Sequence, residues 1–261
     1  MGVRPMQITL DEGYFFGLAV FETLAVENGR FCFLKEHLER LQASAKALGI
    51  SNTVNEEQVL AQMDAWKTDG LPQETLDQTA WRSHGALKIM VSEKNLLFLP
   101  RENHYQEVDY EKGFRLEYSA VRRNETSPLI FHKTANYGDC ILEKRGAGKA
   151  GVDERIFLNT RGELAEGTLS NVFFLKEGKL YTPGKECGLL PGVVRRYLLE
   201  KEGAKERVIY PEEIPDFEEC FVTNSLMGIM PVNSLAGHLF AGRKQTEILR
   251  TRYQKYLQRA E

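Results

Sequence analysis

The sequence predicts an α+β protein with two lobes. Three observations lead to this prediction: the length, the mixture of strand-like and helical stretches, and a polar run near the middle of the chain. The 261 residues exceed the usual size of one domain, about 150 residues. A chain of this length, 42% of it hydrophobic, can bury a core that needs neither a metal nor a disulfide.

The first part of the chain predicts a small sheet accompanied by helices. Residues 17–25 are rich in apolar and strand-forming side chains, and the run 30–33 follows after Asn28-Gly29, a dipeptide typical of hairpins. Leucines at helical spacing predict a helix over 34–48 that ends at Gly49. The other expectations here are a helix over 56–66, a polar stretch over 69–83, and strands over 86–91, 95–99 and 113–121.

The polar run 122–128, Arg-Arg-Asn-Glu-Thr-Ser-Pro, is the best candidate for a connection between the lobes. It separates a smaller N-terminal lobe, residues 1–115, from a larger C-terminal lobe, residues 116–261, that carries Lys133. In the second lobe we expect helices over 137–150, 191–202 and 244–259, strands over 156–159, 171–176, 179–181 and 219–223, and hairpin turns at 161–162 and 177–178.

Composition excludes several classes of protein. The formal net charge of −3 argues against a nucleic-acid-binding protein, and no apolar run reaches the roughly 18–20 residues of a membrane span. Residues 1–6 lack the pattern of a signal peptide or a myristoylation site. We therefore expect a cytoplasmic protein. The cysteines are too scattered for a disulfide framework or a metal site, and we expect no metal; they are Cys32, Cys140, Cys187 and Cys220.

A DNA-binding alternative rests on residues 45–51, which resemble the turn of a helix-turn-helix. The next helical stretch, 55–64, contains Glu56, Glu57 and Asp64 and no Lys or Arg. Phosphate would repel such a recognition helix, so we reject this reading.

Three short segments carry groups suited to catalysis, although each also has an ordinary structural explanation. Lys133 lies among aromatic and small residues, where partial burial favours a neutral nucleophilic amine; a surface lysine is the alternative. Glu166 precedes small hydroxyl and amide residues that enter a strand, as at any hairpin edge. Gly192-Val193-Val194 begins a helix whose free N–H groups suit an anion.

Together with His37-Leu38-Glu39-Arg40, these segments resemble the class IV aminotransferase family, the fold-type IV pyridoxal-phosphate enzymes. The resemblance extends from about residue 14 to residue 231 and rests on four motifs in the family's order and spacing. It implies a fold like that of D-amino-acid aminotransferase, with the cofactor between the lobes. It also implies a homodimer and a small-molecule substrate.

The resemblance assigns a role to each matching residue. Lys133 would bind pyridoxal phosphate covalently and move the substrate Cα proton, Glu166 would face the pyridine nitrogen, and Arg40 would clamp the phosphate. Tyr137 would reach the ring hydroxyl. The other residues implied in cofactor binding are Ser170, Asn171, Gly192, Val193, Val194, Asn224 and Ser225.

Within this family the sequence favours 4-amino-4-deoxychorismate lyase, which releases pyruvate and gives 4-aminobenzoate for folate synthesis. Thr23 stands at the position where the lyases resemble one another in having a threonine beside the substrate. Its hydroxyl would protonate the departing carbon. The segment 223–231 and the tight spacing of 133–137 also look lyase-like. A branched-chain or D-amino-acid transaminase is the alternative, and a non-catalytic binding protein is a third. Glu93 replaces a loop that binds substrate carboxylates in relatives, a function for which Arg101, Arg122 and Arg123 are candidates.

Overall fold

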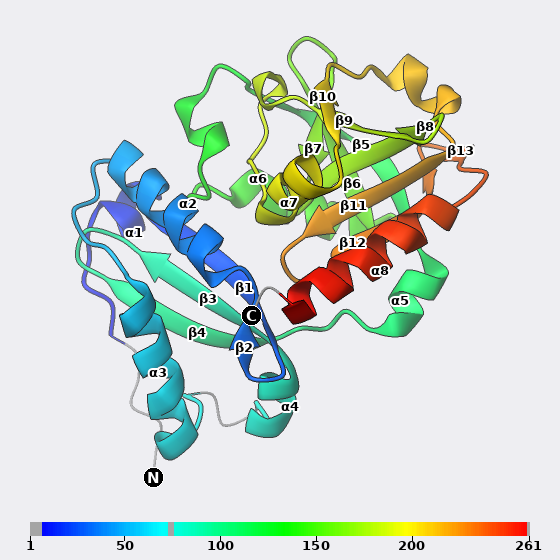
Figure 1. Ribbon diagram of the computed structural model, residues 1–261. Coiled ribbons are helices and arrows are strands. Elements are labelled where there is room, and N and C mark those ends of the chain that lie inside the picture. Colours follow the sequence, from blue (N-terminus) through cyan, green and yellow to red (C-terminus); the bar gives the residue numbers. More distant parts are fainter. Residues whose placement is uncertain (1–6, 73–75, 260–261) are drawn as a thin grey trace. The chain divides into compact units, whose positions relative to one another are not determined.

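The computed structural model of the protein describes residues 7–72 and 76–259 (Figure 1). The expectation for residues 1–6 therefore lies outside the described part of the chain. The chain forms two compact units. The first contains the described residues up to His104 together with His132–Asn136, and the second contains Tyr105–Phe131 and the chain from Tyr137 onward.

The division into units differs from the expected one in two respects. Arg122 and Arg123 belong to a strand, Phe114–Arg123, so the run 122–128 lies inside the second unit and does not connect the two. The short segment that contains Lys133 belongs to the first unit, because its backbone pairs with a strand of that unit. A contact between segments far apart in sequence cannot be read from local composition.

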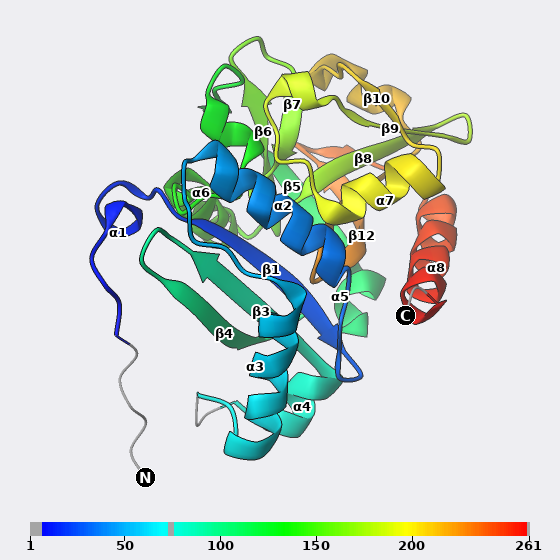
Figure 2. The same cartoon turned by 60° about the vertical axis from the view of Figure 1, so that its left-hand side comes forward.

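The first unit is built on an antiparallel sheet in the order β2-β1-β3-β4. Helix α2 lies along β1 (Figure 2), and their core includes Leu24, Leu41 and Ile89. The predicted hairpin at Asn28-Gly29 and the helix ending near Gly49 are both confirmed. The elements are α1 (Glu12–Phe16), β1 (Val20–Glu27), β2 (Arg30–Phe31), α2 (Leu34–Ala47), α3 (Glu56–Asp69), α4 (Gln78–Ser83), β3 (His84–Val91) and β4 (Leu96–Glu102).

Two short helices of the first unit were not predicted. The α1 helix has five residues between an Asp11 N-cap and a Gly17 C-cap, and none of its side chains is buried. The α4 helix lies in the stretch expected to be polar and buries Trp81 alone. Neither helix has a repeated apolar face, which is the signal that reveals helices in a sequence.

The second unit is built on a mixed sheet in the order β10-β9-β8-β11-β12-β5-β6-β7, with β13 paired to β12. Strands β7 and β8 also approach each other, so the sheet curls. Its core includes Phe174, Val222 and Ile156. The elements are α5 (Glu107–Lys112), β5 (Phe114–Arg123), η1 (Pro128–Phe131), α6 (Gly138–Lys149), β6 (Glu154–Asn159), β7 (Leu164–Gly167), β8 (Asn171–Lys176), β9 (Lys179–Pro183), η2 (Lys185–Cys187), α7 (Val193–Lys201), β10 (Lys205–Arg207), η3 (Pro211–Asp216), β11 (Glu219–Asn224), β12 (Gly228–Leu235), β13 (His238–Leu239) and α8 (Lys244–Arg259).

The most consequential element missed in this unit is β12. Its Pro231 removes a backbone donor, and its flanking Gly228 and Asn233 favour turns, so the sequence does not predict a strand there. The structure pairs β12 with β11 on one side and β5 on the other. In the described ranges no helix has the length and hydrophobicity to span a bilayer, and no His, Cys, Asp and Glu side chains cluster as a metal site.

Candidate active site

The segment with Lys133 is fixed to β1 in the first unit. The Phe21 N–H donates to the Lys133 carbonyl oxygen at 2.8 Å, and Thr134 forms an isolated bridge with Val20. The Lys133 Nζ lies 4.7 Å from the centroid of the Phe21 ring. A cation over an aromatic face is stabilised by the ring electrons, so Phe21 restrains both the backbone and the amine of this lysine.

Thr23 and Phe21 alternate with Glu22 on β1 and therefore share one face of the sheet. Opposite Thr23 stands Lys88, whose Nζ lies 4.3 Å from the centroid of the same Phe21 ring. Burial and the nearby charge of Arg101 lower the pKa of Lys88. The face next to Thr23 thus carries positive side chains, and Lys88 is one that the sequence analysis missed.

Arg40 lies on α2 and forms a bidentate ion pair with Glu22. The Glu22 side chain and the Thr23 side chain lie on opposite faces of β1. His37, one turn earlier on α2, also contacts the Glu22 carboxylate. The i, i+3 spacing in His-Leu-Glu-Arg places both side chains on the same side of the helix. The motif was recognised in the sequence, whereas its carboxylate partner was not.

Glu166 is the residue before the last one of β7, in the second unit, and is buried. Its Oε1 accepts a hydrogen bond from Arg123 Nη2 at 2.8 Å, and its Oε2 accepts one from the Leu190 N–H at 3.0 Å. The Arg123 guanidinium also stacks on Phe157, with Cζ 4.3 Å from the ring centroid. Burial alone would lower the pKa of Arg123, but the neighbouring Glu166, Cys140 and Tyr137 together outweigh this effect and raise it.

Arg123 was a candidate for holding a substrate carboxylate, and the structure corrects this expectation. Its charge is used by Glu166, and its Nη2 also lies 3.0 Å from the Cys140 sulfur. The pair joins the two groups at 2.8 Å, with little of either side chain exposed. Sequence reasoning missed the pairing because residues 123 and 166 meet only through the strand order β5-β6-β7.

The loop before α7 leads into the N-terminal end of that helix. Gly192 is the N-cap of α7, and the first turn of this helix contains no acidic residue. The Asn171 side chain donates to the Leu190 carbonyl oxygen at 2.9 Å. A Cβ on Gly192 would come within 2.2 Å of Asn171 Oδ1, so only glycine allows this close approach. The N–H groups of Val193 and Val194 follow at the positive end of the helix dipole.

Buried hydroxyl groups accompany this helix end in the second unit. Ser170 Oγ and Thr223 Oγ1 are buried, and neither has a hydrogen-bond partner among the residues that the structure describes. Hydroxyls left in this state are unusual, because buried polar groups are normally paired. Ser170 was predicted as a contact residue, whereas Thr223 was missed because a threonine within a strand carries no special signal.

Asn224 and Tyr137 bind backbone groups of the second unit. Asn224 Oδ1 accepts from the N–H groups of Leu226 and Met227 and so forms the turn that contains Ser225. The Tyr137 hydroxyl donates to the Thr168 carbonyl oxygen at 3.4 Å, and burial raises the pKa of Tyr137. The predicted cofactor contacts of Asn224, Ser225 and Tyr137 stay predictions.

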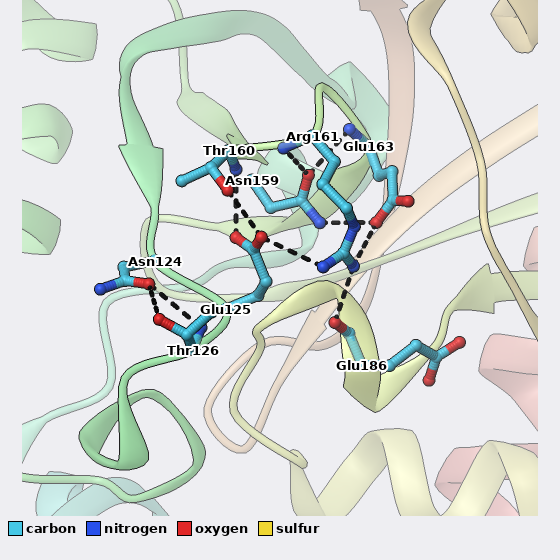
Figure 3. Close-up of polar contacts among 8 residues, drawn as sticks. All are labelled: Asn124, Glu125, Thr126, Asn159, Thr160, Arg161, Glu163 and Glu186. Atoms are coloured by element: carbon cyan, nitrogen blue, oxygen red, sulfur yellow. Dashed lines mark hydrogen bonds and ion pairs between the residues drawn. The ribbon is translucent and has the colours of Figure 1, made fainter.

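A polar network holds η2, the short helix directly before the loop that leads to α7 (Figure 3). Arg161 Nη2 donates to Glu163 Oε2 at 2.6 Å and to the Glu186 carbonyl oxygen at 3.0 Å. Its Nη1 donates to Glu125 Oε1 at 3.1 Å, and Thr160 binds the same carboxylate. The network thereby ties the turn after β6 to η2, which lies directly before the Gly188–Gly192 stretch.

The comparisons with known proteins agree with this arrangement. The family model described as amino-transferase class IV matches residues 19–235. The chain belongs to the class IV aminotransferase family. Members of this family are pyridoxal-phosphate-dependent enzymes that act on small molecules.

Relatives carry two different names. The aminodeoxychorismate lyase of Bacillus subtilis is 29% identical and covers 86% of this chain and 80% of its own length. A "probable branched-chain-amino-acid aminotransferase" of Rickettsia bellii is 28% identical, and the match covers 91% of this chain and 86% of the relative's length. Among solved structures, a "putative 4-amino-4-deoxychorismate lyase" of Legionella pneumophila is 27% identical with a TM-score of 0.84, and the match covers 96% of this chain and 95% of that one.

The residues present fit the cofactor that this family uses. A phosphate needs hydrogen-bond donors: the α7 end supplies backbone N–H groups, and Ser170 and Thr223 carry buried hydroxyls with no partner among the described residues. A pyridine nitrogen needs a carboxylate to hold its proton, and Glu166 is a buried carboxyl group paired with Arg123. The aldehyde needs an amine, and Lys133 provides one.

Proposed function

We propose that the protein is a pyridoxal-phosphate-dependent lyase that converts 4-amino-4-deoxychorismate into 4-aminobenzoate and pyruvate. The 4-aminobenzoate would serve folate synthesis. The observation that carries this proposal is the shared face of Phe21 and Thr23 on β1, with the Lys133 amine over the Phe21 ring. This arrangement supports Lys133 as the proton carrier for the substrate Cα and Thr23 as the proton carrier for the departing carbon.

The residues of both units have separate tasks in this proposal. Lys133 holds the cofactor covalently and takes the proton from the substrate Cα, Glu166 holds a proton at the pyridine nitrogen, and the Thr23 hydroxyl delivers a proton to the departing carbon. Pyridoxal phosphate, when bound, supplies an electron-withdrawing ring that accepts the electron pair from Cα. The phosphate contacts are Arg40, the Val193 and Val194 N–H groups, and the side chains of Ser170, Asn171, Asn224 and Ser225.

The substrate class is supported by the charge next to Thr23. Lys88 pairs with Thr23, and Arg101 pairs with Ala86, two residues further along β3 on the same face. Two cations on one face suit a substrate with more than one carboxylate. 4-Amino-4-deoxychorismate is such a substrate. A branched-chain amino acid has an apolar side chain and would leave one of these charges without a partner.

The cofactor proposal is tested on the purified protein. After incubation with pyridoxal phosphate, we expect a visible absorption band that borohydride bleaches, with the cofactor then found on the Lys133 peptide by mass spectrometry. Lys133→Ala should abolish both signals. A band that persists in Lys133→Ala would contradict the assignment of the lysine.

The reaction is tested by supplying two kinds of substrate in parallel. With 4-amino-4-deoxychorismate we expect equal amounts of 4-aminobenzoate and pyruvate. With glutamate or D-alanine and 2-oxo acids we expect little amino transfer. The transaminase alternative, to which the Rickettsia relative points, predicts amino transfer and no 4-aminobenzoate, and that outcome would overturn the lyase proposal.

We also propose a cytoplasmic homodimer. The proposal of a dimer is supported by three aromatic side chains on α1, each more than half exposed: Tyr14, Phe15 and Phe16. Exposed apolar groups gathered on one short element are typical of an interface. The location is supported by four buried cysteines that form no disulfide. Light scattering on the purified protein should give twice the chain mass of 29.8 kDa, and a single-chain mass would contradict the dimer.

A further inference from the structure

Glu22 is a fully buried carboxylate in the centre of β1. It lies between Val20 and Leu24 on the face of the strand that packs against α2, and none of its surface is exposed. A buried charge is costly unless it is paired and hydrogen-bonded. Glu22 accepts three hydrogen bonds of 2.6 Å, one from His37 Nδ1, one from Arg40 Nε and one from Arg40 Nη2.

The charges within this group of three are well defined. Burial opposes ionisation of Glu22, but the charges and hydrogen bonds of Arg40 and His37 together outweigh it and lower the pKa of Glu22 to about 2. Burial lowers the pKa of His37, and the positive charges of Arg40 and Lys133 act in the same direction. His37 is therefore neutral at pH 7 and donates from Nδ1. Its buried Nε2, which has no hydrogen-bond partner in the described residues, is then an acceptor and not an orphaned N–H.

We propose that Glu22 is the positioning residue for the phosphate clamp: it grips the Arg40 guanidinium along its Nε–Nη2 edge and so fixes the direction in which the other edge points. This inference rests on the proposed role of Arg40 in binding the cofactor phosphate. A guanidinium is planar, so two parallel hydrogen bonds along one edge set the orientation of the whole group. Without Glu22, the long Arg40 side chain would lose its rotational freedom only on binding, which weakens affinity.

The cost of this arrangement is electrostatic, because a carboxylate near the clamp reduces the attraction for a dianion. Glu22 must therefore act through geometry and not through net charge. The pattern of hydrogen bonds supports this view, since both carboxylate oxygens accept from Arg40, and the further donor to Oε2 is the neutral His37. The residue is accordingly expected to matter for ligands with a phosphate and not for the aldehyde end of the cofactor.

The aldehyde end is held by a different residue of the same strand. Phe21, the neighbour of Glu22, binds the Lys133 carbonyl oxygen through its N–H and underlies the Lys133 amine. Adjacent residues of β1 thus position the covalent anchor and the phosphate anchor separately. A change at Glu22 should disturb the phosphate anchor and leave Lys133 in place.

The experiment compares the binding of pyridoxal phosphate with that of pyridoxal, which lacks the phosphate, to the apo protein. Kd is measured by absorbance titration for the wild type, Glu22→Gln, Arg40→Lys and the double variant. Glu22→Gln should raise the Kd for pyridoxal phosphate by about tenfold to hundredfold, the range for loss of one charge-assisted hydrogen bond. The Kd for pyridoxal should change by less than about twofold. The double variant should bind no worse than Arg40→Lys, because a lysine has no edge to orient.

The matched control is Glu27→Gln, which lies on the same strand and pairs with a histidine, His84, at 2.7 Å outside the core. It should leave both Kd values unchanged. Glu22→Asp, which keeps the charge and shortens the reach, replaces Glu22→Gln if thermal unfolding shows that the glutamine variant does not fold, and it should show the same selective loss.

The outcomes separate this inference from the proposed function. If Arg40→Lys leaves the Kd for pyridoxal phosphate unchanged, the proposed role of Arg40 is wrong. If Arg40→Lys weakens binding and the Glu22 variants do not, or if they weaken pyridoxal equally, the positioning role of Glu22 is wrong. Losses in Glu22→Gln and Arg40→Lys that add fully in the double variant would also overturn it, because they would show that the two residues act independently.

Discussion

At the scale of single residues, the proposed lyase reaction depends on the hydroxyl of Thr23. Replacing Thr23 by valine keeps the shape and the strand propensity and removes only the hydroxyl. Since proton transfer by a positioned side chain contributes at least about a hundredfold to rate, we expect the formation of 4-aminobenzoate to fall by about this factor. The Kd for pyridoxal phosphate should not change. Stopped-flow assays and absorbance titrations measure the two quantities, and an equal loss in both would remove the proposed role of this hydroxyl.

Arg123 makes a second prediction at this scale. Arg123→Met keeps the contact with Phe157 and leaves the buried Glu166 without its cation, so the free energy of unfolding should fall by about 3–5 kcal/mol. Adding Glu166→Gln should recover part of the loss, because a neutral amide needs no counter-charge. Urea unfolding measures both changes. Arg122→Met, at the exposed neighbouring position, is the control, and a loss as large in this variant would contradict the explanation.

Residue types and spacing were sufficient to find the groups that carry charge or nucleophilic character. Lys133, Glu166 and Arg40 stand in short motifs whose chemistry is visible without a structure. Their partners, Glu22 and Arg123, were not found in the same way. A glutamate in a strand and an arginine in a polar run have many uses, and only the pairing of distant strands and helices shows which one applies.

At the scale of elements, the start of α7 is defined by Gly192. Because a Cβ there would meet Asn171 Oδ1 at 2.2 Å, Gly192→Ala should displace the Asn171 side chain and break its hydrogen bond to Leu190. We expect a loss of about 1–3 kcal/mol in the free energy of unfolding and a higher Kd for pyridoxal phosphate.

The control for this variant has the opposite expected sign. Gly148 lies in α6 with no atom near the position of an added Cβ, so Gly148→Ala should stabilise the protein by up to about 1 kcal/mol. Its neighbour Gly146 differs, because an added Cβ would meet Arg155 Nη1 at 2.8 Å. Unfolding experiments on Gly192→Ala and Gly148→Ala test the explanation that the contact with Asn171 requires glycine at position 192. The explanation fails if Gly192→Ala is as stable as the wild type.

Elements with a regular pattern were predicted best. The helices α2 and α8 and the β8–β9 hairpin agree with the sequence to within two residues, because each has apolar residues at the expected period or a turn dipeptide. The short α1 and α5 and the proline-containing β12 lack these signals. The positions of α1 and α5 depend on their caps, and that of β12 depends in part on pairing with β5, which lies far away in sequence.

At the scale of the whole molecule, stability should decrease with acid in two steps. The pKa of His37 is lowered on folding, so its protonation favours the unfolded chain once the pH falls below about 6.5. Glu22 has a pKa of about 2 in the folded state against 4.5 ordinarily. Its contribution is therefore complete above pH 4.5 and is lost as the pH falls from 4.5 towards 2.

Urea unfolding at a series of pH values measures this dependence. His37→Gln should flatten the part of the curve that begins just below pH 6.5, and Glu22→Gln should flatten it below pH 4.5. The half-exposed pair of Glu27 and His84 provides the comparison, since Glu27→Gln should keep both steps. A wild-type curve that is level from pH 7 to 4 would contradict the prediction for His37.

The residues 132–136 belong to the first unit although 27 residues of the second unit, 105–131, precede them in the chain. During synthesis on a ribosome, a nascent chain that ends at residue 104 contains the whole β1–β4 sheet but not the lysine that pairs with its first strand. The first unit can complete its structure only after part of the second has left the exit tunnel. A chain interrupted before residue 133 would therefore contain Glu22 and Arg40 and lack Lys133, the residue proposed to attach the cofactor.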